Sequence, residues 1–365
     1  MKFEKLLRFA KTNRASDLIL KSGSPPVLRI FGEIKPVEAR PLTDSDIQEF
    51  LLGVIGEEEF RLFRKGLERD VAVTIPDLGR FRINVFQQRR RLGTVLRLID
   101  DAPPPLQTLH LPQVVRDVAM RERGLVLVTG AAGSGKTTTI ASMIQFRAER
   151  DACHIISVED PIEYIIQSEN ALVDQRQLGR DTHSFANALR HALRQDPDVI
   201  VVGEMRDLDT IQMAITAAET GHLVISTLHT VDAVRTIDRI IDVFPSYQQR
   251  QVRLQLSANL IGVISQTLVR NIRKDNFILA AEILIATGAI QNLIREGKTY
   301  MIGSMVQTGG DESMRTMNRA FYELIQKRMA TYEECLARSP NPEELEKLMG
   351  KRATLMETLL QGGNG

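Results

Sequence analysis

The sequence contains no tryptophan, and aromatic residues make up only 5% of its 365 positions. Single-stranded nucleic acids are usually bound on aromatic platforms, and dedicated nucleic-acid binders are usually basic. This chain has a formal net charge of only +1, and its triplet Arg89-Arg90-Arg91 is typical of a solvated turn. Nucleic acid is therefore not expected as a partner.

Cysteine is also scarce. The two cysteines, Cys153 and Cys335, have no partner residues at the spacing of a metal site or a redox motif. With 43% hydrophobic and 25% charged residues, a chain of this length can bury a sizeable core without disulfides or a structural metal. A reduced, cytoplasmic setting is expected.

Long apolar runs are missing as well. Nowhere do about 18 uninterrupted apolar residues occur, and no transmembrane segment is therefore expected. Residues 1–18 have the pattern of a short amphipathic helix and lack the apolar run and the cleavage site of a signal peptide.

The first hundred residues predict a small α+β domain over 1–100. Three runs of β-branched and aromatic residues in partial alternation, 27–32, 81–87 and 94–99, predict strands. Residues 44–66 have helical spacing and an aspartate-rich start. Pro103 to Pro105 then remove backbone donors and favour an extended path, which predicts a linker over 101–115. A surface loop inside one domain is the alternative.

Residues 116–365 predict a second domain of the α/β class. Nearly continuous apolar runs alternate here with helical segments, at 124–130, 154–160, 198–204 and 222–229. Strands that are hydrophobic on both faces are typical of a mostly parallel sheet covered by helices on both sides. From about residue 250 the pattern predicts a helical C-terminal part, followed by a flexible glycine-rich tail at 362–365.

The most specific motif is GAAGSGKT at 130–137, which fits the phosphate-loop pattern G-x-x-x-x-G-K-[ST] between a predicted strand and a predicted helix. Glycines let backbone N–H groups converge on phosphate oxygens, and the helix N-terminus adds partial positive charge. Lys136 is expected to reach the β- and γ-phosphates of ATP, and the Thr137 hydroxyl to bind Mg²⁺. The predicted nucleotide-binding residues of the loop are Gly130, Ala132, Gly133, Ser134, Gly135, Lys136, Thr137 and Thr138.

Acidic residues follow two of the predicted parallel strands. The carboxyl ends of such strands face the ligand crevice. Glu204, directly after a strand and a glycine, is predicted as the general base. Glu163 is predicted to orient water or Mg²⁺, whereas Glu159 and Asp160 could instead cap a turn or bind a neighbouring arginine.

Two histidines frame another strand. His229 at its carboxyl end is predicted to sense the γ-phosphate. His222, about 20 Å away at 3.3 Å per extended residue, suits a structural or interface role. Many arginines could neutralise the negative charge that develops on the transferred phosphoryl group, and the sequence alone does not show which of them lies near the nucleotide. The candidates are Arg190 and Arg194, predicted on one helix face, and Arg82 and Arg97 on strands of the small domain.

Together these segments resemble the type II/IV secretion ATPase superfamily of P-loop NTPases and, within it, the type IV pilus retraction ATPases. The likeness runs from about residue 4 to residue 330. It rests on ASDLIL at 15–20, FRINVF at 81–86, GAAGSGKTTT at 130–139, SVEDPIEY at 157–164, DPDVIVVGEMRD at 196–207 and TAAETGHLVISTLHT at 216–230. AIQNLIRE at 289–296, which includes Gln291 and Arg295, and QTGG at 307–310 follow motifs of the retraction branch.

The resemblance implies a PAS-like N-terminal domain, a RecA-like ATPase domain, and a Mg²⁺-dependent ATPase that powers pilus retraction and twitching motility. It implies a homohexamer in which each small domain packs on the neighbouring ATPase domain. It also implies docking on the inner-membrane platform protein of the pilus machinery, and thus a cytoplasmic protein held at that membrane. By motif position, Lys136, Glu163, Glu204 and His229 match catalytic and binding residues. Arg82 and Arg97 match small-domain arginines that reach the nucleotide.

The sequence departs from the family pattern in a few places. Ala131-Ala132 replaces the usual Pro-Thr, Ile19 replaces a histidine, and Gln291 replaces the arginine of AIRNLIRE. The tetracysteine insertion typical of assembly and secretion relatives is absent, which favours the retraction branch. An accessory retraction paralogue or a related secretion-system ATPase is the nearest alternative. A nucleic-acid translocase and a nucleotide-binding scaffold without turnover are alternatives of a different class.

Overall fold

The computed structural model describes residues 3–13, 15–30, 32–99, 102–308 and 313–350. The chain forms two compact units, one of residues 1–103 together with 161–165, the other of residues 104–160 and 166–365. The sequence-based limits of 1–100, 101–115 and 116–365 stay a prediction. Residues 100 and 101 of the predicted linker and the predicted tail at 362–365 lie outside the described residues.

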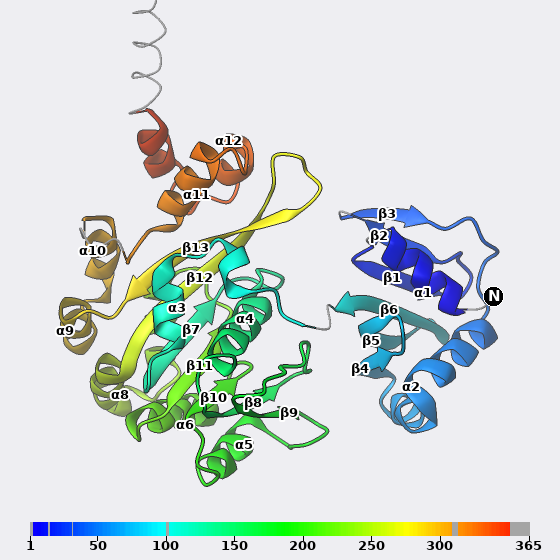
Figure 1. Cartoon of the computed structure of the whole chain (residues 1–365), viewed down its shortest axis with the longest axis horizontal. Helices are drawn as coiled ribbons and strands as arrows, with labels where there is room; N and C mark the ends of the chain where they lie inside the picture. The colour runs from blue at the N-terminus through cyan, green and yellow to red at the C-terminus, as the bar shows by residue number, and fades with distance from the viewer. Residues whose placement is uncertain (1–2, 14, 31, 100–101, 309–312, 351–365) are drawn as a thin grey trace, which may run out of the picture. The chain divides into compact units, whose positions relative to one another are not determined.

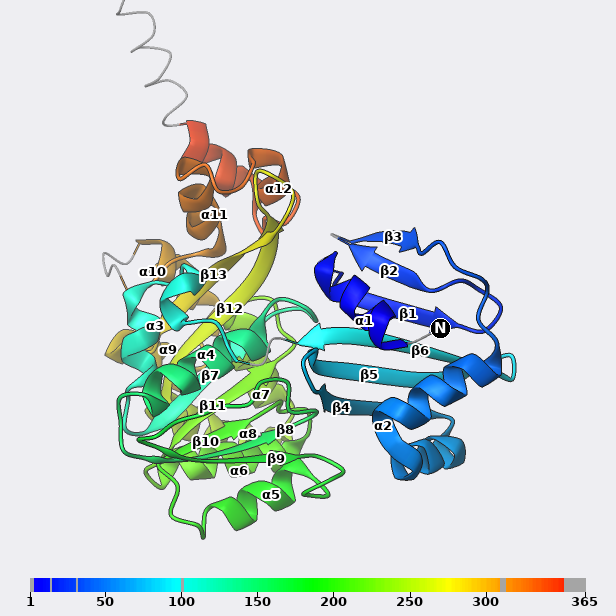
Figure 2. The same cartoon turned by 45° about the vertical axis from the view of Figure 1, so that its right-hand side comes forward.

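The first unit is a six-stranded antiparallel sheet with two helices (Figures 1 and 2). Its elements are α1 (Phe3–Thr12), β1 (Asp17–Lys21), β2 (Val27–Ile30), β3 (Glu33–Pro36), α2 (Asp44–Gly66), β4 (Glu68–Ile75), β5 (Gly79–Gln88) and β6 (Arg91–Ile99). The strand order is β3-β2-β1-β6-β5-β4. A capping box of Thr43 and Asp46 starts α2, which contains a break at Gly56. Arg89 and Arg90 form the turn between β5 and β6, and both are exposed.

Alternation along these strands separates an apolar face from a charged face. The cross-strand partners that join α1 and α2 in one core are Leu28, Leu18, Leu96, Ile83 and Val71. The adjacent positions, which point to the opposite face, are Arg29, Asp17, Arg97 and Arg82. A row of charged side chains thus crosses four strands on the side away from the helices.

The second unit is built on a seven-stranded sheet in the order β13-β12-β7-β11-β10-β8-β9. Its strands are β7 (Gly124–Thr129), β8 (His154–Glu159), β9 (Leu172–Gln177), β10 (Val199–Val202), β11 (Leu223–Leu228), β12 (Leu260–Arg270) and β13 (Phe277–Ile285). All neighbouring strands are parallel except β12 and β13, which form an antiparallel pair. The predicted fold class is confirmed: a small domain with an antiparallel sheet, and an α/β domain with a mostly parallel sheet.

Helices cover both faces of this sheet. Leu125 and Leu127 of β7 share a core with α6, α7, α8 and α9, whereas the alternate residues Val126 and Val128 are buried on the other face, where α4 packs. The helices are α3 (Gln113–Ala119), α4 (Lys136–Ala148), α5 (Phe185–Ala192), α6 (Leu208–Glu219), α7 (Ala233–Asp242), α8 (Ser246–Asn259), α9 (Gly288–Glu296), α10 (Ile302–Thr308), α11 (Met317–Gln326) and α12 (Tyr332–Leu336). Short 3₁₀ turns lie at Leu106–Leu109 and Thr299–Met301.

The C-terminal part differs in one respect from the sequence-based prediction. Helices were expected from about residue 250, and α9 to α12 confirm a helical C-terminal part, but β12 and β13 precede these helices and form a long hairpin (Figure 1). The ends of the two strands carry a separate small core with α11 and α12 around Val269, Ala280 and Phe321. Across the described ranges, no helix is both long and apolar enough to cross a membrane.

Candidate nucleotide site

The phosphate loop joins the end of β7 to the start of α4, as its motif requires. Gly130, Gly133 and Gly135 have φ values of 143°, 76° and 90°, a region that favours glycine. A Cβ atom on Gly130 would collide with the carbonyl oxygen of Gln266 and lie 2.5 Å from Ser134 Oγ. The loop is therefore curled tightly against the sheet at its first residue, whereas Ala131, Ala132 and Gly133 are exposed.

Lys136 folds back over this loop. Its Nζ donates hydrogen bonds to the carbonyl oxygens of Gly130 at 2.8 Å and Ala131 at 2.9 Å, and the residue is only 8% exposed. Burial lowers the pKa of Lys136, while the nearby charge of Glu204 opposes that shift. The ammonium group is thus held at the mouth of the loop, where a phosphate group can pair with it.

Oxygen donors of the kind that Mg²⁺ prefers are present beside the loop. The Thr137 hydroxyl stands in the first turn of α4, directly after Lys136. Glu159 and Glu204 follow or end neighbouring parallel strands at the same edge of the sheet. Glu159 accepts hydrogen bonds from Ser157 and Gln175. The donor set fits a magnesium nucleotide. Within the described residues, no group of three or more histidine, cysteine or acidic side chains forms a metal site of its own.

Glu204 sits at the exit of β10 with two cationic or polar partners. Its Oε2 lies 2.7 Å from Arg206 Nε and 3.4 Å from His229 Nε2, and its side chain is 13% exposed. The preceding Gly203 allows a close turn, because a Cβ there would lie 3.1 Å from the carbonyl oxygen of Val158. The structure thus brings together Lys136, Glu204 and His229, three of the residues predicted from sequence. Arg206 was missed, although it stands only two positions after Glu204.

The other predicted histidine lies elsewhere. His222 precedes β11, at the opposite end of that strand from His229. Its Nδ1 is 2.9 Å from the carbonyl oxygen of Ala217, and its own carbonyl accepts from the Gly124 N–H. His222 therefore fastens the end of α6 to the starts of β7 and β11.

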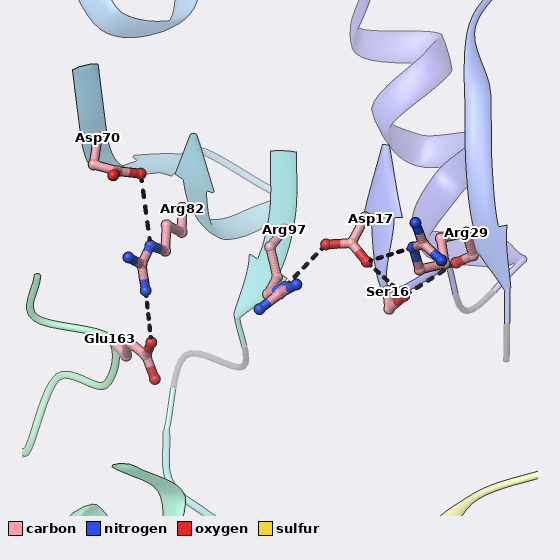
Figure 3. A network of polar contacts seen from close by, with 7 residues as sticks. All are labelled: Ser16, Asp17, Arg29, Asp70, Arg82, Arg97 and Glu163. Carbon is pink, nitrogen blue, oxygen red and sulfur yellow. Dashed lines mark hydrogen bonds and ion pairs between the residues drawn. The ribbon is translucent and has the colours of Figure 1, made fainter. Parts of the chain in front are cut away.

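The small unit holds Arg82, Arg97 and Glu163 (Figure 3). Arg82 Nη1 lies 3.3 Å from Glu163 Oε1, and its Nε lies 3.8 Å from Asp70 Oδ1. Arg97 Nε donates to Asp17 Oδ1 at 2.9 Å, and the buried Asp17 also faces Arg29. Arg82 and Arg97 are direct partners on β5 and β6. The two arginines therefore lie side by side on the charged face of the sheet.

Four further predicted residues lie on helices or just beyond them. Arg190 is on α5, but this helix ends at Ala192, and Arg194 lies outside it. The expectation that both share one helix face is therefore wrong, because the chain leaves the helix before a further turn is completed. Gln291 and Arg295 are on α9, whose residues Ile290 and Ile294 are buried, and Arg295 is exposed. Gly309 and Gly310 of the QTGG segment lie outside the described residues.

Comparison with known proteins places these features in a group of relatives. The family described as type II/IV secretion system protein matches residues 92–348. The type IV pilus retraction ATPase PilT of Pseudomonas aeruginosa is 43% identical over 343 residues, which cover 94% of this chain and 99% of that protein. The type IV pilus ATPase PilU of the same organism is 39% identical over 349 residues, covering 96% and 91%. The crystal structure of the pilus retraction motor PilT with bound ADP is 45% identical, covers 95% of this chain and 99% of that one, and has a TM-score of 0.87.

Proposed function

The chain belongs to the type II/IV secretion system protein family, and we propose that it hydrolyses ATP to power the retraction of type IV pili. The observation that carries this proposal is the phosphate loop with Lys136 buried at its mouth, under the influence of Glu204. The extent of the likeness supports it, since 94% of the chain aligns with a pilus retraction ATPase.

The residues of the second unit have distinct roles in this reaction. The loop N–H groups and Lys136 bind the phosphates, and Glu204 accepts a proton from the attacking water as general base. His229 lies within 3.4 Å of the Glu204 carboxylate and can respond to the γ-phosphate. Thr137 and the neighbouring carboxylates would hold Mg²⁺, which neutralises phosphate charge. Arg206, on the same carboxylate oxygen, keeps Glu204 oriented for this step.

The residues of the small unit supply charge to the same reaction. Arg82 and Arg97 meet the developing negative charge on the transferred phosphoryl group. Each is paired with a carboxylate in the structure, Arg82 with Glu163 and Arg97 with Asp17. Glu163 orients water or Mg²⁺, the role of the residue at its motif position in the retraction ATPases.

The working assembly is a homohexameric ring that docks on the inner-membrane platform protein of the pilus machinery. The protein then acts in the cytoplasm, held at the membrane by its partner. The observation in favour is the near-complete coverage, 99%, of the solved pilus retraction motor. Movements of the ring would extract pilin subunits.

A second candidate is an accessory retraction motor that assists a primary one. Two observations favour it: the 39% identity to the type IV pilus ATPase PilU and the uncharged Gln291 at a motif position occupied by arginine in retraction ATPases. A deletion strain decides between the two. Loss of retraction supports a primary motor, and retraction that persists supports an accessory one.

The enzymatic proposal is tested by Mg²⁺-dependent ATP hydrolysis of the purified protein across a concentration series. Glu204→Gln should abolish turnover and keep nucleotide binding, and Lys136→Ala should lose binding. Glu219→Gln is the matched control, because Glu219 ends α6 and pairs with Gln255 outside the site. Activity that rises steeply with concentration supports the ring. Nucleotide binding without hydrolysis at any concentration would refute the motor in favour of a scaffold.

A further inference from the structure

Strand β12 passes beside the phosphate loop, although it lies far from it in sequence. It runs parallel to β7, and its Ser265 pairs with Thr129, the last residue of that strand. Their buried hydroxyl oxygens are 2.9 Å apart. The next residue of β12, Gln266, therefore reaches beyond the end of β7 to the level of the loop.

Gln266 contacts the first residue of the loop and the helix that follows the loop. Its backbone carbonyl oxygen fills the space that a Cβ on Gly130 would need. Its side-chain Nε2 donates a 2.8 Å hydrogen bond to Thr139 Oγ1 in the first turn of α4. Gln266 is 2% exposed and Thr139 is fully buried. One buried residue thus joins the first residue of the loop to the helix that follows it.

Two polar atoms around this contact have no hydrogen-bond partner in the described part of the chain. They are Gln266 Oε1 and the Oγ of Ser134, and both are buried. Buried polar groups are nearly always paired, and those that are not tend to mark strained or functional positions. A purely structural contact between β12 and α4 could be made by apolar side chains without this cost. The polar contact between Gln266 and Thr139 is therefore better explained by a functional need to hold the phosphate loop in one shape for phosphate binding.

We propose that Gln266 is a positioning residue for ATP binding. It holds the phosphate loop in the curled shape in which the loop N–H groups converge on phosphate, by fixing Gly130 and the first turn of α4 relative to each other. This inference rests on the proposed function, because it takes the loop to be the ATP site. The proposal gives β12 a role in nucleotide binding, although none of the nucleotide-binding motifs in the sequence lies on that strand.

Binding of a fluorescent ATP analogue with Mg²⁺ tests the contact through a double-mutant cycle. Gln266→Leu and Thr139→Val each remove one partner and should weaken binding about three- to tenfold, the range of one buried hydrogen bond. The double variant should bind no more weakly than the poorer single variant, because both changes remove the same contact. Thr139→Ser keeps the hydroxyl and should bind like the wild type.

Further readouts separate positioning from general destabilisation. Gln266→Leu should raise KM with kcat retained, and amide hydrogen exchange across 130–135 should become faster in the nucleotide-free protein. Gln249→Leu is the control, since Gln249 lies on α8, outside the loop, and donates a hydrogen bond to the carbonyl oxygen of Phe244. Unchanged binding in Gln266→Leu, or fully additive losses in the double variant, would overturn the inference. A wild type that binds ATP without hydrolysing it overturns only the proposed function; one that binds no ATP overturns both.

Discussion

Single residues in the nucleotide site are held by more contacts than the chemistry alone requires. Lys136 bonds two carbonyl oxygens of its own loop, and Glu204 is shared by Arg206 and His229. These contacts keep charged groups paired in the nucleotide-free protein. A bound phosphate must compete with these partners for Lys136. The role of each partner can therefore be tested by substitution.

Arg206→Ala should lower kcat for ATP hydrolysis about tenfold and leave nucleotide binding close to wild type. The reason is that Glu204 loses its 2.7 Å partner and adopts several orientations, of which few suit a general base. The measurement is steady-state hydrolysis beside analogue binding. Arg338→Ala is the control, since Arg338 forms an ion pair of the same 2.7 Å length with Glu334, on α12. Equal kcat in Arg206→Ala and wild type would contradict the prediction.

Gly130→Ala should abolish nucleotide binding and lower the melting temperature. The added Cβ collides with the backbone of Gln266, which belongs to a central strand and cannot move aside. Gly221→Ala is a matched control, because Gly221 also has a positive φ, 107°, but nothing lies within 4 Å of its Cβ position. Thermal unfolding and analogue binding compare the two variants. The prediction fails if both variants bind alike.

The elements around the phosphate loop were predictable because their sequence signals are local. Strand β7, the loop and α4 are consecutive in the chain, and the glycine spacing of the motif predicts the backbone conformation of the loop. Strands β12 and β13 were not predictable in the same way. FILAAEILI in β13 combines two alanines, two leucines and a glutamate, which favour helices, with three isoleucines and a phenylalanine, which favour strands, and its pairing with β12 makes it a strand. The contribution of Gln266 was hidden for the same reason.

The charged row of the small unit was only half predictable. Arg82 and Arg97 could be proposed from a family resemblance, whereas Asp17, although it lies in the ASDLIL segment, was not predicted as a partner of either arginine. Its contact with Arg97 depends on the register of β1 against β6, which the sequence does not state. Glu163 is a similar case, because its pairing with Arg82 joins residues 81 positions apart.

Glu282 ties two helices to the sheet and should make stability depend on pH. Its carboxylate accepts from the Ala233 N–H at the start of α7 and from the Met317 N–H at the start of α11. Burial raises the pKa of Glu282 from 4.5 to about 7, and the charges of Asp232 and Glu344 add to this. The folded protein therefore binds a proton that the unfolded chain releases between these two pH values.

The stabilisation that follows is complete below pH 4.5 and is lost as the pH rises through 7. At most it amounts to about 3 kcal/mol, given 1.36 kcal/mol per pKa unit. Urea unfolding at pH 5 and pH 8 should therefore show a larger loss in the wild type than in Glu282→Gln, which keeps an acceptor oxygen but cannot titrate. Parallel losses in the two proteins would count against this role of Glu282.

At the scale of the whole molecule, the nucleotide site depends on chain that lies outside all its motifs. Truncation after Asn259 keeps the phosphate loop, Glu204 and His229 but removes β12 and β13. We expect this fragment not to bind the ATP analogue, because β7 becomes an edge strand and Gly130 loses its contact with the Gln266 backbone. A chain ending at residue 350 keeps every described element and serves as the control. Analogue binding by the shorter fragment at wild-type affinity would show that β12 is dispensable.

The bond between Thr139 and Gln266 spans 127 positions, and this separation has a consequence during synthesis. At about 5–20 residues per second, a ribosome needs roughly 6–25 s to travel from one residue to the other. Throughout that interval the loop lacks its contacts with Gln266, although all its own residues have been translated. A nascent chain should therefore become able to capture ATP only late, after β12 has left the exit tunnel.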